Sequence, residues 1–189
     1  YYTMSSFSSW GVPGSLTLKP EITAPGGEIY SVWGTNAVTG GGYNKYVTMS
    51  GTSMAAPQVT GMAALMAQVY RENGMADKSG ISARHLAQSL LMSTAQPLYE
   101  EASGGNYYSL LNQGAGLARV DLAFQADSFI KVEGQEDYKV KAELGDDPQR
   151  TGIYEFEFSI NNLTDREKVY ALEADLFRQD VFEYQPDSD

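Results

Sequence analysis

The stretch that decides the fold is Gly51-Thr52-Ser53-Met54-Ala55-Ala56-Pro57, which leads into an Ala-rich run ending at Asn73-Gly74. Glycine and threonine before the serine predict a turn, and the following residues predict a helix from about Ser53 to Glu72. At a helix N-terminus, unpaired N–H groups and the helix dipole favour developing negative charge. Ser53 is therefore a candidate nucleophile, although the same pattern also serves as an ordinary helix start.

The predicted helix is apolar nearly all round. Small residues alternate with larger apolar ones, among them Met62, Leu65, Met66 and Val69. We expect a helix of this kind to be buried on most of its sides. Pro57 is expected in the first turn, where a missing N–H does least harm.

Composition narrows the class of protein. Its 189 residues carry a net charge of −11, and the 13 lysines and arginines are scattered, which argues against nucleic-acid binding. Cysteine is absent from the sequence, which excludes disulfides, thiol catalysis and Cys-based zinc sites. No apolar run approaches the roughly 18 residues that span a bilayer, so neither a membrane span nor a signal peptide is predicted.

The composition changes near residue 127, which divides the chain into residues 1–127 and 128–189. The first part combines short predicted strands with a second helix that begins after Ser82 and ends at Ser93. The strands are expected at 22–24, 29–33 and 46–49, with a loop at 40–42. The second part predicts an antiparallel sandwich with strands at 129–132, 138–144, 153–160 and 169–177. The fold class is therefore α/β, followed by a partial β module.

Four segments carry a resemblance to a known family. The heptapeptide around Ser53 resembles the serine signature of subtilisin-like proteases at every defined position. Phe7-Ser8-Ser9-Trp10-Gly11 and Lys19-Pro20-Glu21-Ile22-Thr23-Ala24-Pro25-Gly26 resemble the two family segments that precede this signature. Gln113-Gly114-Ala115-Gly116-Leu117 resembles the segment that closes the catalytic domain. The matches follow the family's order along the chain.

This resemblance implies a three-layer domain around a parallel sheet, with Ser53 as the nucleophile of a serine endopeptidase. The catalytic aspartate and histidine and the oxyanion asparagine are expected upstream of Tyr1, so this chain alone should be inactive. Within the family, the sequence resembles the lactocepin-like cell-envelope proteinases of Gram-positive bacteria. That branch implies protein or peptide substrates, an extracellular or cell-wall location, and a fibronectin-III-like module over 128–189. The alternative is a degenerate protease that serves as an adhesion or structural scaffold.

Other polar residues are weaker candidates. His85 is interpreted as a packing residue rather than the catalytic base. The pairs Glu100-Glu101 and Asp146-Asp147 are interpreted as solvated carboxylates, with calcium binding as the alternative. Asn162-Leu163-Thr164 matches a glycosylation sequon but is expected to form a turn. No cofactor or metal ion is predicted for this chain, and structural calcium is left open as an alternative for the parent protein.

The apolar helix also raises the question of what covers it. Either a further part of the parent protein does so, or copies of this chain bury the face against each other. Self-association is favoured, with Met62, Leu65, Met66 and Val69 at the contact.

Overall fold

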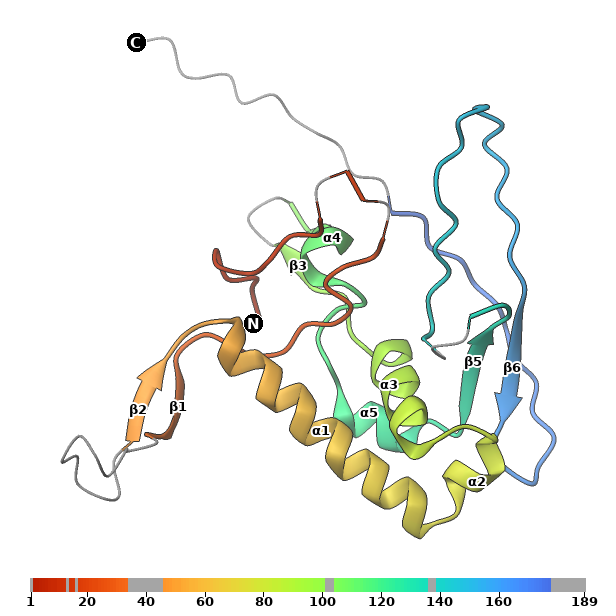
Figure 1. The fold of residues 1–189 in the computed structure, drawn as a ribbon, viewed down its shortest axis with the longest axis horizontal. Coiled ribbons are helices and arrows are strands. Elements are labelled where there is room, and N and C mark those ends of the chain that lie inside the picture. Colours follow the sequence, from red (N-terminus) through yellow and green to blue (C-terminus); the bar gives the residue numbers. More distant parts are fainter. Residues whose placement is uncertain are drawn as a thin grey trace.

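Figure 1 shows the computed structural model, which describes residues 2–12, 14–15, 17–33, 46–100, 104–135 and 139–177. Its longest element is helix α1 (Thr52–Glu72), which carries Ser53 and matches the predicted helix. Strands β1 (Ile29–Val32) and β2 (Tyr46–Met49) form an antiparallel pair that projects from the N-terminal end of α1. The predicted loop at 40–42 lies outside the described residues.

Local signals in the sequence fix the helix boundaries. The N–H of Asn73 donates to the Val69 carbonyl, and Gly74 follows with a left-handed φ of 71°, so α1 ends where the sequence predicts. Helix α3 (Ala83–Ser93) begins after Ser82, whose Oγ accepts a hydrogen bond from the His85 N–H, which confirms the predicted cap. The short helix α2 (Met75–Ser79), between them, was not predicted.

The core lies where α1, α3, α5 (Val120–Gln125) and β5 (Ser128–Val132) meet. Tyr70 of α1 is buried there, and its hydroxyl donates to the Ala123 carbonyl over 2.9 Å. Burial raises the pKa of Tyr70 to about 12, so this donor stays protonated at neutral pH. The larger buried side chains from the packed elements are Met66, Tyr70, Leu86, Leu90, Leu91, Phe129 and Leu163.

The prediction that α1 is buried on most sides is wrong for this structure. Met66 is fully buried, but the neighbouring Leu65 is 57% exposed and Val69 is 37% exposed. The core elements pack against one stripe of the helix, so the other faces remain accessible. Pro57 also lies in the second turn of α1 rather than in the first. Because proline has no N–H, the Ser53 carbonyl receives no helical hydrogen bond from this position.

The sheets of the described residues are small and antiparallel, and the fold is a mixed α/β arrangement. β3 (Tyr99–Glu100) pairs with β4 (Asn106–Tyr107), and β5 pairs with β6 (Phe158–Asn162). Helix α4 (Leu110–Gln113) follows β4. Among the described residues, parallel pairing is confined to the bridge between Thr23 and Leu117.

Part of the predicted second module differs from expectation. Strand β5 matches the strand predicted at 129–132, but β6 covers only the end of the predicted 153–160 strand. Residues 139–144 and 169–177, predicted as strands, are not in strands. A strand requires a hydrogen-bonded neighbour, and in the described part of the chain β5 and β6 pair only with each other.

None of the helices in the described segments is both long and apolar enough to cross a lipid bilayer.

Candidate active site

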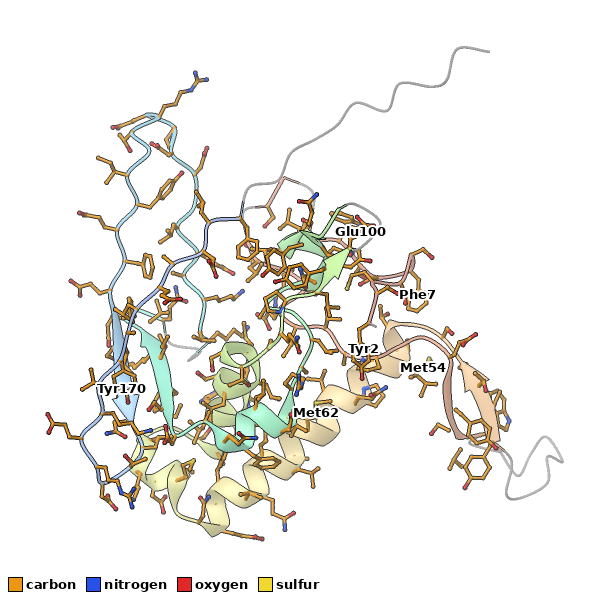
Figure 2. All side chains as sticks on the ribbon, turned by 180° about the vertical axis from the view of Figure 1, so that it is seen from behind. Tyr2, Phe7, Met54, Met62, Glu100 and Tyr170 are labelled. Atoms are coloured by element: carbon orange, nitrogen blue, oxygen red, sulfur yellow. The ribbon has the colours of Figure 1, made fainter. Side chains whose placement is uncertain are left out.

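Ser53 lies in the first turn of α1 and is exposed. Gly51 precedes the helix with a φ of 154°, a value that residues with a side chain rarely adopt. The Met54 N–H donates to the Gly51 carbonyl over 3.0 Å, while the N-cap glycine offers no side chain to the first-turn N–H groups. Figure 2 shows Met54 at this end of α1, next to the β1–β2 pair. This arrangement places a hydroxyl beside helix N–H groups that can stabilise an oxyanion.

The segment Lys19–Gly26 holds the start of α1. The Gly51 N–H donates to the Gly26 carbonyl over 2.8 Å, and Gln58 Nε2 donates to the Pro25 carbonyl over 2.6 Å. A Cβ on Gly26 would lie 2.7 Å from the Gly51 carbonyl oxygen, which is closer than real contacts allow. Glycine at this position therefore lets the two backbones approach.

The closing segment Gln113–Leu117 is hydrogen-bonded to the same segment, Lys19–Gly26. The Thr23 N–H donates to the Gly116 carbonyl over 2.9 Å, and the Ala118 N–H donates to the Thr23 carbonyl over 2.8 Å. Thr23 Oγ1 also donates to the Gln113 carbonyl over 2.8 Å. The middle and closing segments of the sequence resemblance thus form one hydrogen-bonded unit.

Gln113 fixes this unit from inside. Its side chain is fully buried and accepts from the Leu98 N–H over 2.7 Å, while Nε2 donates to the Tyr108 carbonyl over 2.7 Å. A buried amide that satisfies both of its polar ends locks the loop around it. No sequence pattern marks this role of Gln113, because its partners depend on the fold and not on spacing.

The first segment joins through α4. The Gly11 N–H donates to the Leu111 carbonyl over 2.7 Å. Asn112 Nδ2 lies 3.4 Å from the carbonyl oxygens of both Ser8 and Ser9. All four segments that carry the sequence resemblance are therefore connected by hydrogen bonds, and the unit they form supports Ser53.

His85 belongs to a different element. It lies in the first turn of α3, where its backbone N–H donates to the Ser82 cap. Its Nε2 lies 3.5 Å from Arg84 Nη2. Helix α3 follows α2, which lies near the C-terminal end of α1, opposite the end that carries Ser53 (Figure 1). The interpretation of His85 as a packing residue stays a prediction.

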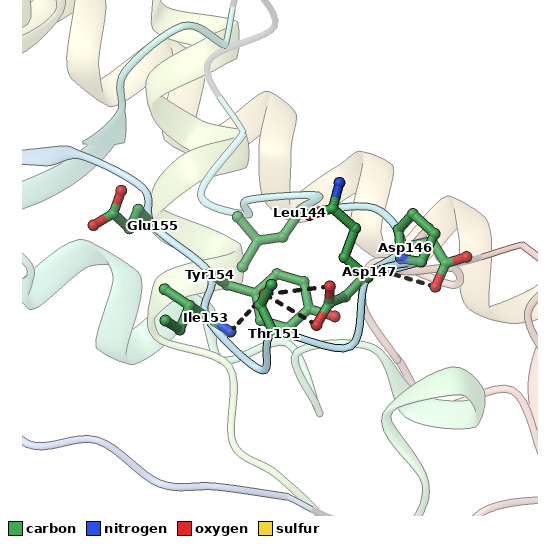
Figure 3. A pocket seen from close by; sticks show the side chains of 9 residues that line it. Leu144, Asp146, Asp147, Thr151, Ile153, Tyr154 and Glu155 are labelled. Atoms are coloured by element: carbon green, nitrogen blue, oxygen red, sulfur yellow. Dashed lines mark hydrogen bonds between the residues drawn. The ribbon is translucent and has the colours of Figure 1, made fainter.

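The acidic pair Asp146-Asp147 lies in a turn of the second part of the chain. Asp147 accepts hydrogen bonds from the Gly152 N–H over 2.6 Å and from Thr151 Oγ1 over 3.2 Å (Figure 3). The Gly152 N–H is the main cause that lowers the pKa of Asp147. The carboxylate is thus used to close its own turn, beside a shallow cavity of about 330 Å³.

The acidic side chains do not form a metal-binding cluster in the part of the chain that the structure describes. Within the described ranges, no group of three or more His, Asp or Glu side chains could hold a metal ion. Glu101 of the other acidic pair lies outside those ranges.

Asn162 forms the predicted turn, because its Oδ1 accepts from the Thr164 N–H over 2.9 Å and its Nδ2 donates to the Arg166 carbonyl over 2.6 Å.

The structure places an exposed serine in the first turn of α1, next to segments that are joined by hydrogen bonds. Comparison with known proteins identifies the class of protein to which the chain belongs. A profile of the Subtilase family matches residues 1–127, and the chain belongs to this family of subtilisin-like serine peptidases.

The chain is also similar in sequence to peptidases of two kinds of bacteria, streptococci and lactococci. Over 171 residues, or 90% of the chain, it is 32% identical to the C5a peptidase of Streptococcus pyogenes serotype M6. Over 65% of the chain, it is 35% identical to the PII-type proteinase of Lactococcus lactis subsp. cremoris. The chain spans only 13% of the first of these relatives and 6% of the second.

Solved structures with a related chain include the PatG macrocyclase domain. It is 27% identical, with a TM-score of 0.44, over 63% of this chain and 31% of that one.

Proposed function

We propose that this chain supplies the nucleophile of a serine endopeptidase, with Ser53 attacking the substrate carbonyl. The observation that carries the proposal is the position of Ser53 in the first turn of α1, within a family match over residues 1–127. An exposed hydroxyl can reach a bound peptide, and the N–H groups around it can receive the charge of a tetrahedral intermediate.

The reaction would proceed through an acyl-enzyme. Ser53 Oγ forms a bond to the carbonyl carbon as its proton passes to a base, and that base returns the proton to the leaving amine when the C–N bond breaks. Water then releases the acyl group by the reverse proton path. The chain contains one histidine, His85, which we assign to packing. In subtilisins the triad order along the chain is Asp, His, Ser, so we place the base and its aspartate in a preceding part of the protein.

The domain organisation belongs to the same proposal. Residues 1–127 would form the C-terminal part of a three-layer catalytic domain with a parallel sheet, and residues 128–189 the start of a fibronectin-III-like module. The extent of the family match and the start of β5 at Ser128 support this division. The streptococcal and lactococcal relatives, together with the resemblance to cell-envelope proteinases, support an extracellular or cell-wall location and protein or peptide substrates.

A fluorophosphonate probe tests the proposal directly, because it reacts only with an activated serine. In the full-length protein, we expect Ser53 to be labelled and Ser53→Ala to reduce turnover by about 10⁴-fold or more without changing the circular dichroism spectrum. Ser93→Ala is the matched control and should retain activity, because Ser93 is an exposed residue at the end of α3 whose Oγ donates only locally, to the Leu90 carbonyl over 3.3 Å.

The isolated 189-residue chain provides the complementary test. A serine without a base is a weak nucleophile, so we expect no labelling above background. Rapid labelling of the isolated chain would show that it contains its own base. An unlabelled Ser53 in the full-length protein would instead favour the degenerate scaffold.

A further inference from the structure

The carboxylate of Glu21 gathers three lysines from two distant parts of the chain. Its Oε1 lies 2.8 Å from Lys19 Nζ, 2.9 Å from Lys139 Nζ and 3.2 Å from Lys141 Nζ. The Glu21 side chain is only 19% exposed, and that of Lys141 only 10%. A partly buried carboxylate shared by three ammonium groups is unlike an ordinary surface ion pair, which is solvated and contributes little.

We propose that Glu21 is the docking point at which segment 139–143 of the second module attaches to the serine-bearing module. Lys141 makes the attachment directional, because its Nζ also approaches the Leu18 carbonyl at 3.4 Å and pairs with Glu143. The occupant of this surface is thus a segment of the same chain, identified by the contacts themselves. The proposal does not depend on the activity of Ser53.

The contact between Glu21 and segment 139–143 is called the dock below. The charges around it favour the ionised form of the Glu21 carboxylate. Glu21 faces Lys19, Lys139 and Lys141, and Glu143 pairs with Lys141. Arg84 also lines the cavity of about 330 Å³ that Glu21 borders between α1 and α3. Partial burial acts to raise the pKa of Glu21, but hydrogen bonds from the three lysines outweigh it and lower the pKa to about 2.

The dock acts on the segment that supports the candidate nucleophile. The Glu21 carbonyl accepts from the Ala115 N–H over 3.0 Å, and the same segment continues to Gly26, which holds Gly51. The second module has an independent apolar anchor, since Phe129 of β5 and Leu163 lie in the core. Two anchors of different chemistry fix an orientation that one anchor would leave free to pivot.

Distance measurement between two spin labels tests the dock. The chain has no cysteine, so Arg71→Cys on α1 and Leu144→Cys beside the docked segment provide unique labelling sites, both exposed. We expect a narrow distance distribution, with about a twofold broadening in Glu21→Gln and in the double variant Lys139→Met with Lys141→Met. The matched control removes the exposed pair Lys131–Glu133 of β5 by Lys131→Met with Glu133→Gln, and should stay narrow.

The lowered pKa of Glu21 sets the pH range over which the ionic attachment should hold. A carboxylate with a lowered pKa contributes fully above its unfolded value of 4.5, and the contribution is lost as pH falls through about 2. At about pH 3.5 the parent chain should therefore keep its narrow distribution while its circular dichroism is unchanged. A narrow distribution in Glu21→Gln at neutral pH would overturn the proposal, because the attachment would then not depend on the charge of Glu21.

Discussion

Gly26 shows how a single missing side chain positions the candidate site. A Cβ there would lie 2.7 Å from the Gly51 carbonyl oxygen and 3.2 Å from Ala55 Cβ, so the backbone or the helix would have to shift. We expect Gly26→Ala to lower the free energy of unfolding by about 1–3 kcal/mol, the usual cost of overpacking. Chemical denaturation followed by circular dichroism measures this change.

The neighbouring glycine provides the control for this substitution. A Cβ on Gly27 would have Ser5 Oγ as its nearest neighbour, at an ordinary 3.7 Å. Gly27→Ala should therefore change the free energy of unfolding by no more than about 0.5 kcal/mol. Equal effects at the two positions would show that close packing against Gly51 does not explain Gly26.

At the scale of the residue, a functional side chain can be predicted from the sequence when the residues that mark it are contiguous. Ser53 could be singled out because its turn, its helix start and its signature are contiguous, and the structure places it in the first turn of α1. Glu21 and Gln113 could not, since Lys139 is distant from Glu21 along the chain and Gln113 bonds to Leu98, 15 residues away. Lysines at 139 and 141 have no spacing relationship with residue 21 that a sequence pattern would detect.

At the scale of the element, α1 presents one buried stripe and one accessible face. Met66 is completely buried, whereas the adjacent Leu65 is 57% exposed. We expect Met66→Ala to cost about 2–5 kcal/mol of unfolding free energy, because it removes core contacts and leaves a cavity. Leu65→Ala should cost less than about 1 kcal/mol, since it removes mainly exposed surface. Thermal or urea denaturation of both variants distinguishes the two faces, and a larger loss for Leu65→Ala would contradict the observed packing.

Helices were predictable and several strands were not, for a physical reason. The ends of α1 and α3 depend on Asn73-Gly74 and Ser82, which act within a few residues of themselves. A strand depends on a partner. Residues 153–157 alternate as a strand should, yet Tyr154 and Phe156 are 48% and 54% exposed and the segment does not lie in a strand. Alternation alone therefore could not determine which segments pair.

At the scale of the whole molecule, the mixed α/β class followed from the order of helices and strands, whereas the parallel sheet did not appear in the described residues. The bridge from Thr23 to Leu117 is their single trace of parallel pairing. A parallel sheet is built from strands joined by crossovers, so a chain that spans 13% of a relative need not contain enough of them. Patterns within this chain could not show which neighbours complete the sheet.

The accessible face of α1 leads to a prediction about association. Leu65 and Val69 of α1, with Leu122 and Phe124 of α5, are each between 37% and 57% exposed. Phe124 makes an edge contact with Tyr70 of α1, so the two helices are neighbours. Met66 is buried within the chain itself, which removes it from the expected contact. Apolar surface shared by neighbouring helices favours burial against a second copy.

We therefore expect light scattering to give a mass above that of one chain, falling toward the monomer in Leu65→Glu, because a carboxylate in the contact would have to be desolvated. Gln149→Glu adds the same charge at an exposed turn of the second part of the chain and should leave the mass unchanged. A monomeric parent chain at high protein concentration would show that this face does not bind another copy. A parent and a Leu65→Glu variant of equal, larger mass would place the contact on another surface.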